Sequence, residues 1–119
     1  MATFSKVLHS GSTGGRPIKV VATATAGTTI HSTGTSASII DEIWIYATNT
    51  STSAVLLTLE WGGVTSPDDK IVASIPPQST VVVVPGQPLA GTGSAARTVG
   101  AFAGTTAVIN IFGYVNRIS

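Results

Sequence analysis

The sequence feature that most constrains the fold is a period-2 pattern between residues 39 and 61, IIDEIWIYATNTSTSAVLLTLEW. An extended chain places successive side chains on opposite faces, so Ile43 and Ile45 share one face while Trp44 and Tyr46 share the other. Residues 55–61 continue this alternation, and the residues between the two segments are Asn, Thr and Ser, which favour turns. The pattern predicts two β-strands joined as a hairpin.

Composition indicates one all-β domain with an unusual surface. The chain has 119 residues, of which 43% are hydrophobic and 9% charged, against about 25% charged in an average globular protein. Ser and Thr supply roughly a quarter of the residues, and no window carries the apolar stripe of an amphipathic helix. Because a surface of low charge gives little protection against association, we expect part of it to be buried against other chains; the alternative is a soluble monomer.

The sequence argues against nucleic-acid binding, disulfide bonding, secretion and membrane insertion. The net charge of +1, without clustered Lys or Arg, argues against nucleic-acid binding. The absence of cysteine excludes disulfides and thiolate chemistry. The N-terminal residues lack the apolar core of a signal peptide, and no run of about 18 apolar residues occurs. We therefore expect a protein that is made in a cytoplasm and does not enter a membrane.

The rest of the chain predicts a flexible N-terminal arm over residues 1–16 and a single β-sandwich domain over residues 17–119. Turn signals separate further strands predicted at residues 17–25, 27–32, 70–75, 80–84, 95–103 and 107–117, with residues 85–94 as the longest loop. Seven or eight strands about ten residues apart are typical of an antiparallel sandwich. A jelly-roll-like sandwich is our first interpretation and an immunoglobulin-like sandwich the second.

The sequence predicts no catalytic, metal-binding or cofactor-binding site. His9 and His31 have no acid or second histidine at metal-ligand spacing, so they are predicted to be surface histidines. Glu60, Asp68 and Asp69 could approach one another, but Pro67-Asp68-Asp69 is ordinary turn chemistry. No serine lies in a G-x-S-x-G elbow. We therefore expect a protein that is not an enzyme and binds no small-molecule substrate.

The aromatic residues leave two interpretations open. Trp44 and Tyr46 project from one face of a strand, where aromatics can stack sugars or anchor a protein interface. The structural alternative, which we favour slightly, is that they pack the sandwich core beside Phe112 and Tyr114. Trp61, next to two glycines, is the better candidate for an exposed anchor.

Four segments of the chain resemble small virion proteins of tailed bacteriophages. They are residues 40–50 (IDEIWIYATNT), LEWGG at 59–63 with PDD at 67–69, VPG at 84–86, and FGYVNRI at 112–118. The resemblance covers residues from about 28 to the C-terminus. It implies a capsid decoration (cement) protein, which is a β-sandwich on the outside of the phage head that is often a homotrimer and clamps neighbouring major capsid protein subunits.

This resemblance gives the sequence its most specific functional hypothesis. The expected location is the outer capsid surface of the virion, after synthesis in the bacterial cytoplasm. The alternatives are a tail, neck or fibre component of a phage, or a carbohydrate-binding module of the adhesin type. Since such families bind through surfaces, the predicted interface residues are the apolar and basic residues of the arm and the candidate anchor, namely Phe4, Lys6, Val7, Leu8, Arg16 and Trp61.

Overall fold

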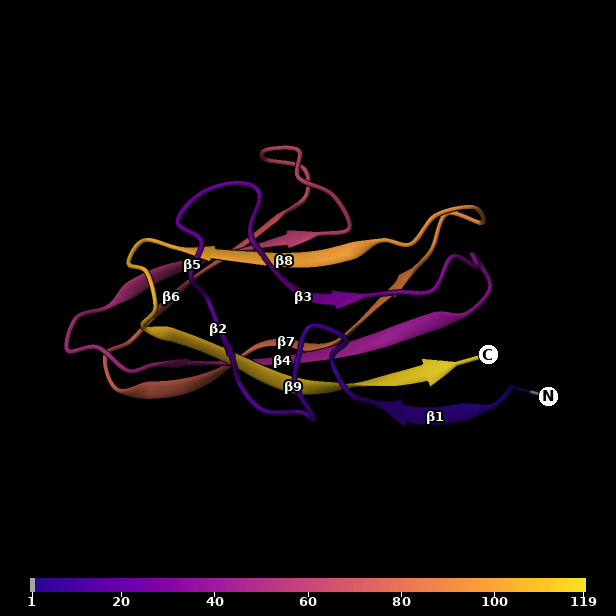
Figure 1. The fold of residues 1–119 in the computed structure, drawn as a ribbon, viewed down its shortest axis with the longest axis horizontal. Coiled ribbons are helices and arrows are strands. Elements are labelled where there is room, and N and C mark those ends of the chain that lie inside the picture. Colours follow the sequence, from indigo (N-terminus) through magenta and orange to yellow (C-terminus); the bar gives the residue numbers. More distant parts are fainter. Residues whose placement is uncertain (1) are drawn as a thin grey trace.

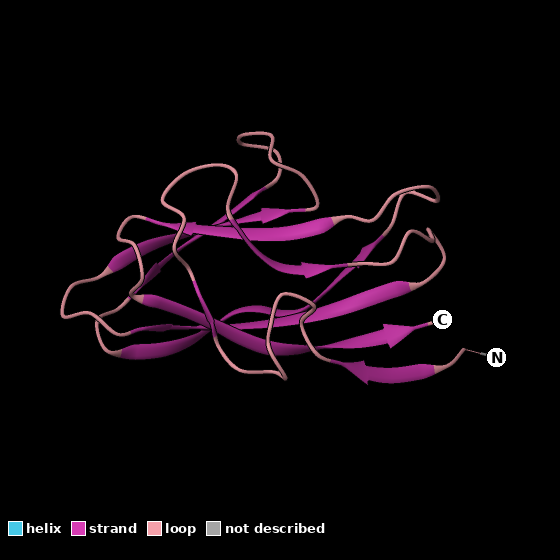
Figure 2. Ribbon diagram, in the orientation of Figure 1, coloured by secondary structure: helices cyan, strands magenta, loops and turns pink. Residues whose placement is uncertain are grey.

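The computed structural model describes residues 2–119, and this part of the chain contains strands and loops with no helix (Figure 2). No segment within it is therefore a helix long and apolar enough to cross a membrane. The strands are β1 (Phe4–Val7), β2 (Ile18–Lys19), β3 (Thr28–Ser32), β4 (Ile40–Asn49), β5 (Val55–Trp61), β6 (Lys70–Ile75), β7 (Ser79–Ala90), β8 (Thr98–Ala103) and β9 (Ile109–Ile118).

The strands form two antiparallel sheets that face each other (Figure 1). Sheet A has the order β1-β9-β4-β7, with β2 also paired to β9, and sheet B has the order β3-β8-β5-β6. Strands β1 and β2 pair with successive stretches of the same edge of β9, so together they act as one interrupted N-terminal strand. When β1 and β2 are counted as one strand, each sheet has four strands. The strand orders of the two sheets are then those of a jelly roll. The predicted all-β, jelly-roll-like sandwich is confirmed.

The predicted hairpin at residues 39–61 is wrong, although both of its strands exist. Strand β4 pairs with β7 and β9, whereas β5 pairs with β6 and β8 in the opposite sheet. The connection instead crosses between the sheets around Asn49, whose buried side-chain amide donates to the carbonyls of Ser53 at 2.8 Å and Ile75 at 3.0 Å. Placing β4 and β5 in different sheets lets their apolar faces bury each other.

The core lies between the sheets and is made by alternate residues of the long strands. On β4 the inward residues Ile43, Ile45 and Ala47 have no exposed surface, and the same holds for Leu57 and Leu59 on β5. The period-2 assignment of faces is therefore confirmed for both strands. Other fully buried apolar side chains are Val20, Ile30, Ile75, Val99, Ala101, Ala103, Ile109, Ile111 and Val115.

Three strand predictions need correction. The predicted loop at residues 85–94 is mostly strand, because β7 runs to Ala90 past register shifts opposite β4. Pro85 and Pro88 favour a turn in the sequence, but β7 is an edge strand, where proline is tolerated. The strand predicted at residues 17–25 is only the two residues of β2. Residues 4–7, placed in a flexible arm by the sequence, pair with β9; Met1 lies outside the described residues.

Adjacent leucines on β5 test the assignment of faces. Leu57 is fully buried and Leu56 is 52% exposed. We expect Leu57→Ala to lower the free energy of unfolding by about 2–5 kcal/mol, because it leaves a cavity in the core. Leu56→Ala is the matched control, and we expect it to change stability by less than about 0.5 kcal/mol. Urea denaturation followed by fluorescence measures both, and equal losses would contradict the assignment.

Candidate functional site

The outer face of sheet A carries four partly exposed aromatic side chains. Trp44 and Tyr46 project outward from β4, and Tyr114 and Phe112 lie opposite them on β9. The rings of Trp44 and Tyr114 stack with centroids 5.8 Å apart, and those of Tyr46 and Phe112 with centroids 5.3 Å apart. The interpretation that Trp44 and Tyr46 pack in the core beside Phe112 and Tyr114 is wrong, because these four residues stack on the outer face of the sandwich.

One of these stacks extends across four strands of the sheet, β1, β9, β4 and β7. The ammonium group of Lys6 on β1 lies 4.6 Å from the centroid of the Tyr114 ring, a distance suited to a cation–π contact. On the other side, the indole of Trp44 covers Gly86 of β7, where a Cβ atom would lie 3.0 Å from the ring. Both faces of Tyr114 and of Trp44 are therefore occupied by neighbours in the same sheet.

Polar and aliphatic side chains surround this stack. Glu42 accepts hydrogen bonds from the indole Nε1 of Trp44 and the amide of Asn116, both at 3.2 Å. Val82, the β7 residue opposite Tyr46, is 50% exposed. We call this surface the aromatic face, defined as the outward side chains of Lys6, Trp44, Tyr46, Val82, Phe112 and Tyr114. It is a sheet surface with an open hollow at one side, lined by Phe4, Lys6, Glu42 and Asn116.

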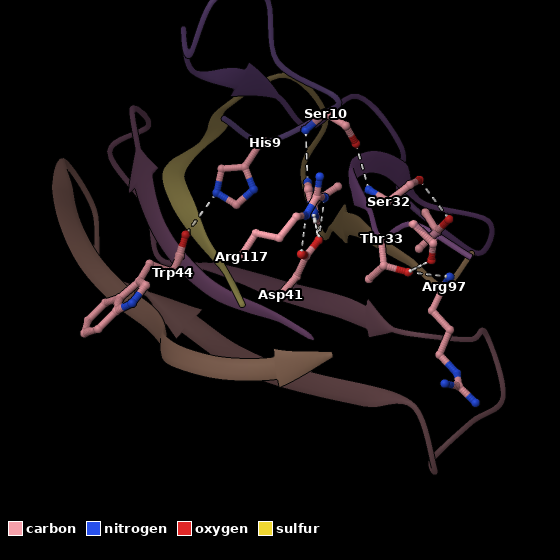
Figure 3. Close-up of polar contacts among 11 residues, drawn as sticks. His9, Ser10, Ser32, Thr33, Asp41, Trp44, Arg97 and Arg117 are labelled. Carbon is pink, nitrogen blue, oxygen red and sulfur yellow. Dashed lines mark hydrogen bonds and ion pairs between the residues drawn. The ribbon is translucent and has the colours of Figure 1, made fainter. Parts of the chain in front are cut away.

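The second candidate is a buried charged group between the sheets (Figure 3). Asp41 of β4 is 1% exposed and accepts two hydrogen bonds from Arg117 of β9, at 2.7 and 2.9 Å. His31 of β3, also 1% exposed, donates from Nε2 to the same carboxylate at 2.8 Å. Since Asp41 and Arg117 belong to sheet A and His31 to sheet B, this group ties the two sheets together.

His31 points inward because β3 contains a β-bulge. The register of β3 against β8 shifts between Thr29 and His31, and as a result both Ile30 and His31 are buried. A bulge turns a side chain that regular alternation would send outward. The prediction of a surface histidine was wrong for this reason.

Ser10, His31 and Asp41 are the residue types of a hydrolytic triad, but their hydrogen bonds differ from those of a triad. Nδ1 of His31 accepts from the backbone N–H of Ser10 at 3.1 Å, whereas the hydroxyl of Ser10 accepts from the backbone N–H of Ser32 at 2.7 Å. In a catalytic triad, the serine hydroxyl must form a hydrogen bond with the histidine that acts as the general base. This arrangement therefore fixes the N-terminal segment to β3 and does not activate Ser10.

His9 occupies the interior beside this group and is 3% exposed, so the surface prediction is wrong for it as well. Its Nε2 lies 2.9 Å from the carbonyl of Trp44 (Figure 3), and its ring meets that of His31 edge to face at 5.8 Å. Gly113 makes this approach possible, because a Cβ there would lie 3.0 Å from Nε2 and overlap the Trp44 carbonyl. Nδ1 of His9 is buried and has no hydrogen-bond partner in the described structure.

The electrostatics of the group keep Asp41 ionised. Burial raises the pKa of Asp41, but the hydrogen bonds from Arg117 and His31 and the charge of Arg117 outweigh burial, so its pKa lies below the ordinary 3.8. The same pair raises the pKa of Arg117, chiefly through its hydrogen bond to Asp41. Burial lowers the pKa of His9 below the ordinary 6.5; the hydrogen bond with Trp44 acts in the opposite direction, and the nearby His31 adds to the lowering.

Glu60 is the second buried carboxylate, and its contacts stabilise the fold. It pairs with Lys70 at 2.6 Å and accepts hydrogen bonds from Thr25 at 2.8 Å and the backbone N–H of Gly27 at 2.6 Å. Burial raises its pKa, but these partners lower it below the ordinary 4.5. Asp69 instead accepts from the backbone N–H of Thr65 at 3.0 Å within its turn. Glu60 thus holds the loop before β3 against sheet B.

The predicted interface residues are spread over three regions. Phe4 and Leu8 are 72% and 54% exposed, and Lys6 belongs to the aromatic face. Val7 is half-buried against the core. The remaining two are separate from this region: Arg16 is exposed in the loop before β2, and Trp61 is half-buried against the core and not a free anchor.

The sequence contained one usable signal for the buried group. Asp41 and Arg117 occupy inward positions at the ends of β4 and β9, next to Ile43 and Val115. Opposite charges at the ends of two apolar faces indicate a buried ion pair once those strands are known to be neighbours. No cluster of three or more His, Cys, Asp or Glu residues suited to a metal ion occurs within residues 2–119.

Comparison of the chain with protein-family models, with curated proteins and with solved structures finds no match. The functional argument therefore rests on the residues and their geometry.

Replacement of Asp41 tests the buried group. We expect Asp41→Ala to lower the free energy of unfolding by about 3–5 kcal/mol, because it leaves Arg117 and His31 without their buried acceptor. Asp68→Ala, at an exposed turn position, is the matched control and should change stability by less than about 0.5 kcal/mol. Urea titration of both variants measures the difference, and a mild effect of Asp41→Ala would show that the pair is dispensable.

Acid should destabilise the fold through the two buried carboxylates. Both have a pKa below the ordinary value in the folded state, so the unfolded chain binds more protons as pH falls. Their stabilisation is complete above the ordinary values of 3.8 and 4.5 and is lost as pH falls through the lower folded-state values. Melting temperature measured between pH 6 and pH 2 should fall most steeply below about pH 4.5; a flat profile there would contradict this account.

Proposed function

We propose that the protein is a structural protein of a bacteriophage virion that decorates the outer surface of the capsid and bridges major capsid protein subunits. The observation that carries this proposal is the aromatic face, a broad and uncovered sheet surface of low charge. The resemblance of residues 28–119 to virion proteins agrees with it. The hydroxyl of Ser10 is not hydrogen-bonded to His31, so Ser10, His31 and Asp41 do not form a catalytic triad. This geometry favours a binding role over a catalytic one.

The aromatic face suits a protein partner. Aromatic side chains are enriched at the centres of protein interfaces, where they contribute large contact areas. The stack from Lys6 to Gly86 fixes the rings before binding, which lowers the entropy lost on association. Phe4, from the predicted interface set, is an outward residue of β1 and extends the face at its edge.

The protein would act by strengthening the joints between capsid subunits mechanically. Packaged DNA strains the joints between capsid subunits, and a protein that spans a joint adds buried area to it. A specific interface buries about 800 Å² on each partner, and repeated contacts around a shell sum to a large total. Assembly as a homotrimer, which the resemblance implies, would multiply the contacts that each decorating unit makes.

A glycan-binding module is the second candidate, since exposed aromatics also stack sugars. Stacking of this kind needs a free ring face. Both faces of Trp44 and Tyr114 are already covered, by each other and by Gly86 and Lys6. Tyr46 and Phe112 stack on each other, which covers one face of each ring. The Trp44–Tyr114 stack therefore favours contact through ring edges and with a protein surface.

Two matched valine substitutions test the proposal. Val82 of the aromatic face and Val72 of sheet B are exposed by 50% and 56%, each on an edge strand. We expect the purified protein to add to expanded empty heads, assembled from the major capsid protein of the same genome, at a fixed ratio per capsomer. Val82→Lys should weaken this binding by at least about tenfold, the effect of roughly 1.4 kcal/mol, while Val72→Lys binds normally.

Other outcomes of that experiment are equally informative. If both variants bind like the original protein, the aromatic face is not the contact surface. If the original protein fails to bind heads and is retained on a polysaccharide column, decoration is wrong and the glycan-binding alternative is favoured. Sedimentation of the isolated protein tests the homotrimer separately.

A further inference from the structure

We propose that residues 8–12 form a pH-sensitive latch, in which neutral His9 holds the N-terminal strand β1 on sheet A and its protonation releases that strand. The latch is a property of the isolated chain and does not depend on the proposed function. It rests on the hydrogen bonds of two buried histidines and on the weak packing of β1.

The hydrogen bond of His9 fixes the tautomer of its neutral ring. A backbone carbonyl only accepts, so Nε2, 2.9 Å from the carbonyl of Trp44, must carry the hydrogen. A neutral imidazole then has a bare Nδ1, and this atom is buried without a partner in the described structure. A second proton on Nδ1 would place an unsatisfied N–H and a positive charge in the interior, which is strongly unfavourable.

No free negative charge is present to compensate that proton. The ionisable groups around His9 are His31 from β3, Asp41 from β4 and Arg117 from β9. Arg117 already donates two hydrogen bonds to the carboxylate of Asp41, and His31 donates a third. Two further charged residues near the segment are both basic: Lys6 lies on the outer face over Tyr114, and Arg16 lies in the loop before β2 beside Ser12.

The segment that carries His9 is also bound to β3. The backbone N–H of Gly11 donates to the carbonyl of Ile30 at 2.9 Å, and that of Ser10 donates to Nδ1 of His31 at 3.1 Å. The hydroxyl of Ser10 accepts from the backbone N–H of Ser32 at 2.7 Å. Residues 9–11 are therefore attached both to sheet A, through His9, and to β3 of sheet B.

Strand β1 has little else to hold it in place. Its side chains are exposed except for half-buried Val7, and it is a four-residue strand at the edge of sheet A. Beyond its pairing with β9, its other attachments are the contact of Lys6 with Tyr114 and the two backbone hydrogen bonds between Thr3 and Ser119, and residues 2–7 contribute no fully buried side chain. Loss of the His9 attachment should therefore let β1 detach while the rest of sheet A stays paired.

The direction of the pH effect follows from linkage. The pKa of His9 is lowered in the closed state, first by burial, whereas in the open state the exposed ring returns to about 6.5. The open form therefore binds more protons, and the closed form loses stability as pH falls below 6.5 towards the lower closed-state pKa. Within that window the opening constant should rise by up to about tenfold per pH unit.

Amide hydrogen exchange of the full chain by NMR tests the latch. Between pH 7.5 and pH 5, we expect the protection factors of the β1 amides, corrected for intrinsic exchange, to fall by at least about tenfold, while those of central β4 stay constant. The lower limit of pH 5 keeps Asp41 ionised. His9→Gln is the matched variant, because its amide can still donate to Trp44 but does not titrate; its β1 protection should not depend on pH.

Direct titration of the imidazoles covers the case in which His9→Gln fails to fold. The chain has two histidines, so their side-chain ¹⁵N signals are readily assigned. We expect His9 to be the Nε2–H tautomer at pH 7.5 and to titrate below 6.5, together with the β1 amide shifts. Constant β1 protection, an equal pH response in His9→Gln, or a His9 that titrates at or above 6.5 would each overturn the proposal.

Discussion

The two-sided pairing of β4 is the constraint on which the other features depend. Because β4 lies between β7 and β9, alternate side chains are forced either into the core or onto the aromatic face. Its inward residues supply Ile43, Ile45 and the charged Asp41, while its outward residues supply Trp44 and Tyr46. The backbone carbonyl of Trp44 adds a third role, since it accepts the hydrogen bond from His9. A shift of one residue in the register of β4 would disrupt all three at once.

Periodicity and turn chemistry allowed much of the fold to be predicted. The alternation in β4 and β5 separated the two faces of each strand correctly, because a half-buried strand must separate apolar from polar side chains, but the favoured placement of Trp44 and Tyr46 in the core was wrong. The pairing of β4 with β5 was predicted wrongly. A polar turn such as residues 50–54 is compatible with a hairpin or with a crossing between sheets, and only the burial of both apolar faces decides between them. The number and spacing of the strands supported the jelly roll, whereas which strands pair with β4 and β5 could not be predicted from local pattern.

The candidate site depended on features that local sequence does not express. His31 faces inward only because a bulge interrupts β3. His9 is buried because a loop folds back between β1 and β2 and meets Gly113, more than a hundred residues away in the chain. The covered ring faces of Tyr114 and Trp44 required four strands to be placed side by side. Each of these is a long-range contact, and the aromatic residues themselves were recognisable only as candidates.

The meeting of the two chain ends has a practical consequence. Thr3 and Ser119 exchange two backbone hydrogen bonds, of 2.7 and 2.9 Å, and both ends of the ribbon lie at the same end of the sandwich (Figure 1). A short linker could therefore join them without distortion, and new termini could be opened in an exposed connection at the other end of the sandwich, such as residues 104–106 between β8 and β9 (Figure 1). The jelly roll is thus geometrically suited to circular permutation, which would let a fused domain be displayed from the opposite end of the molecule.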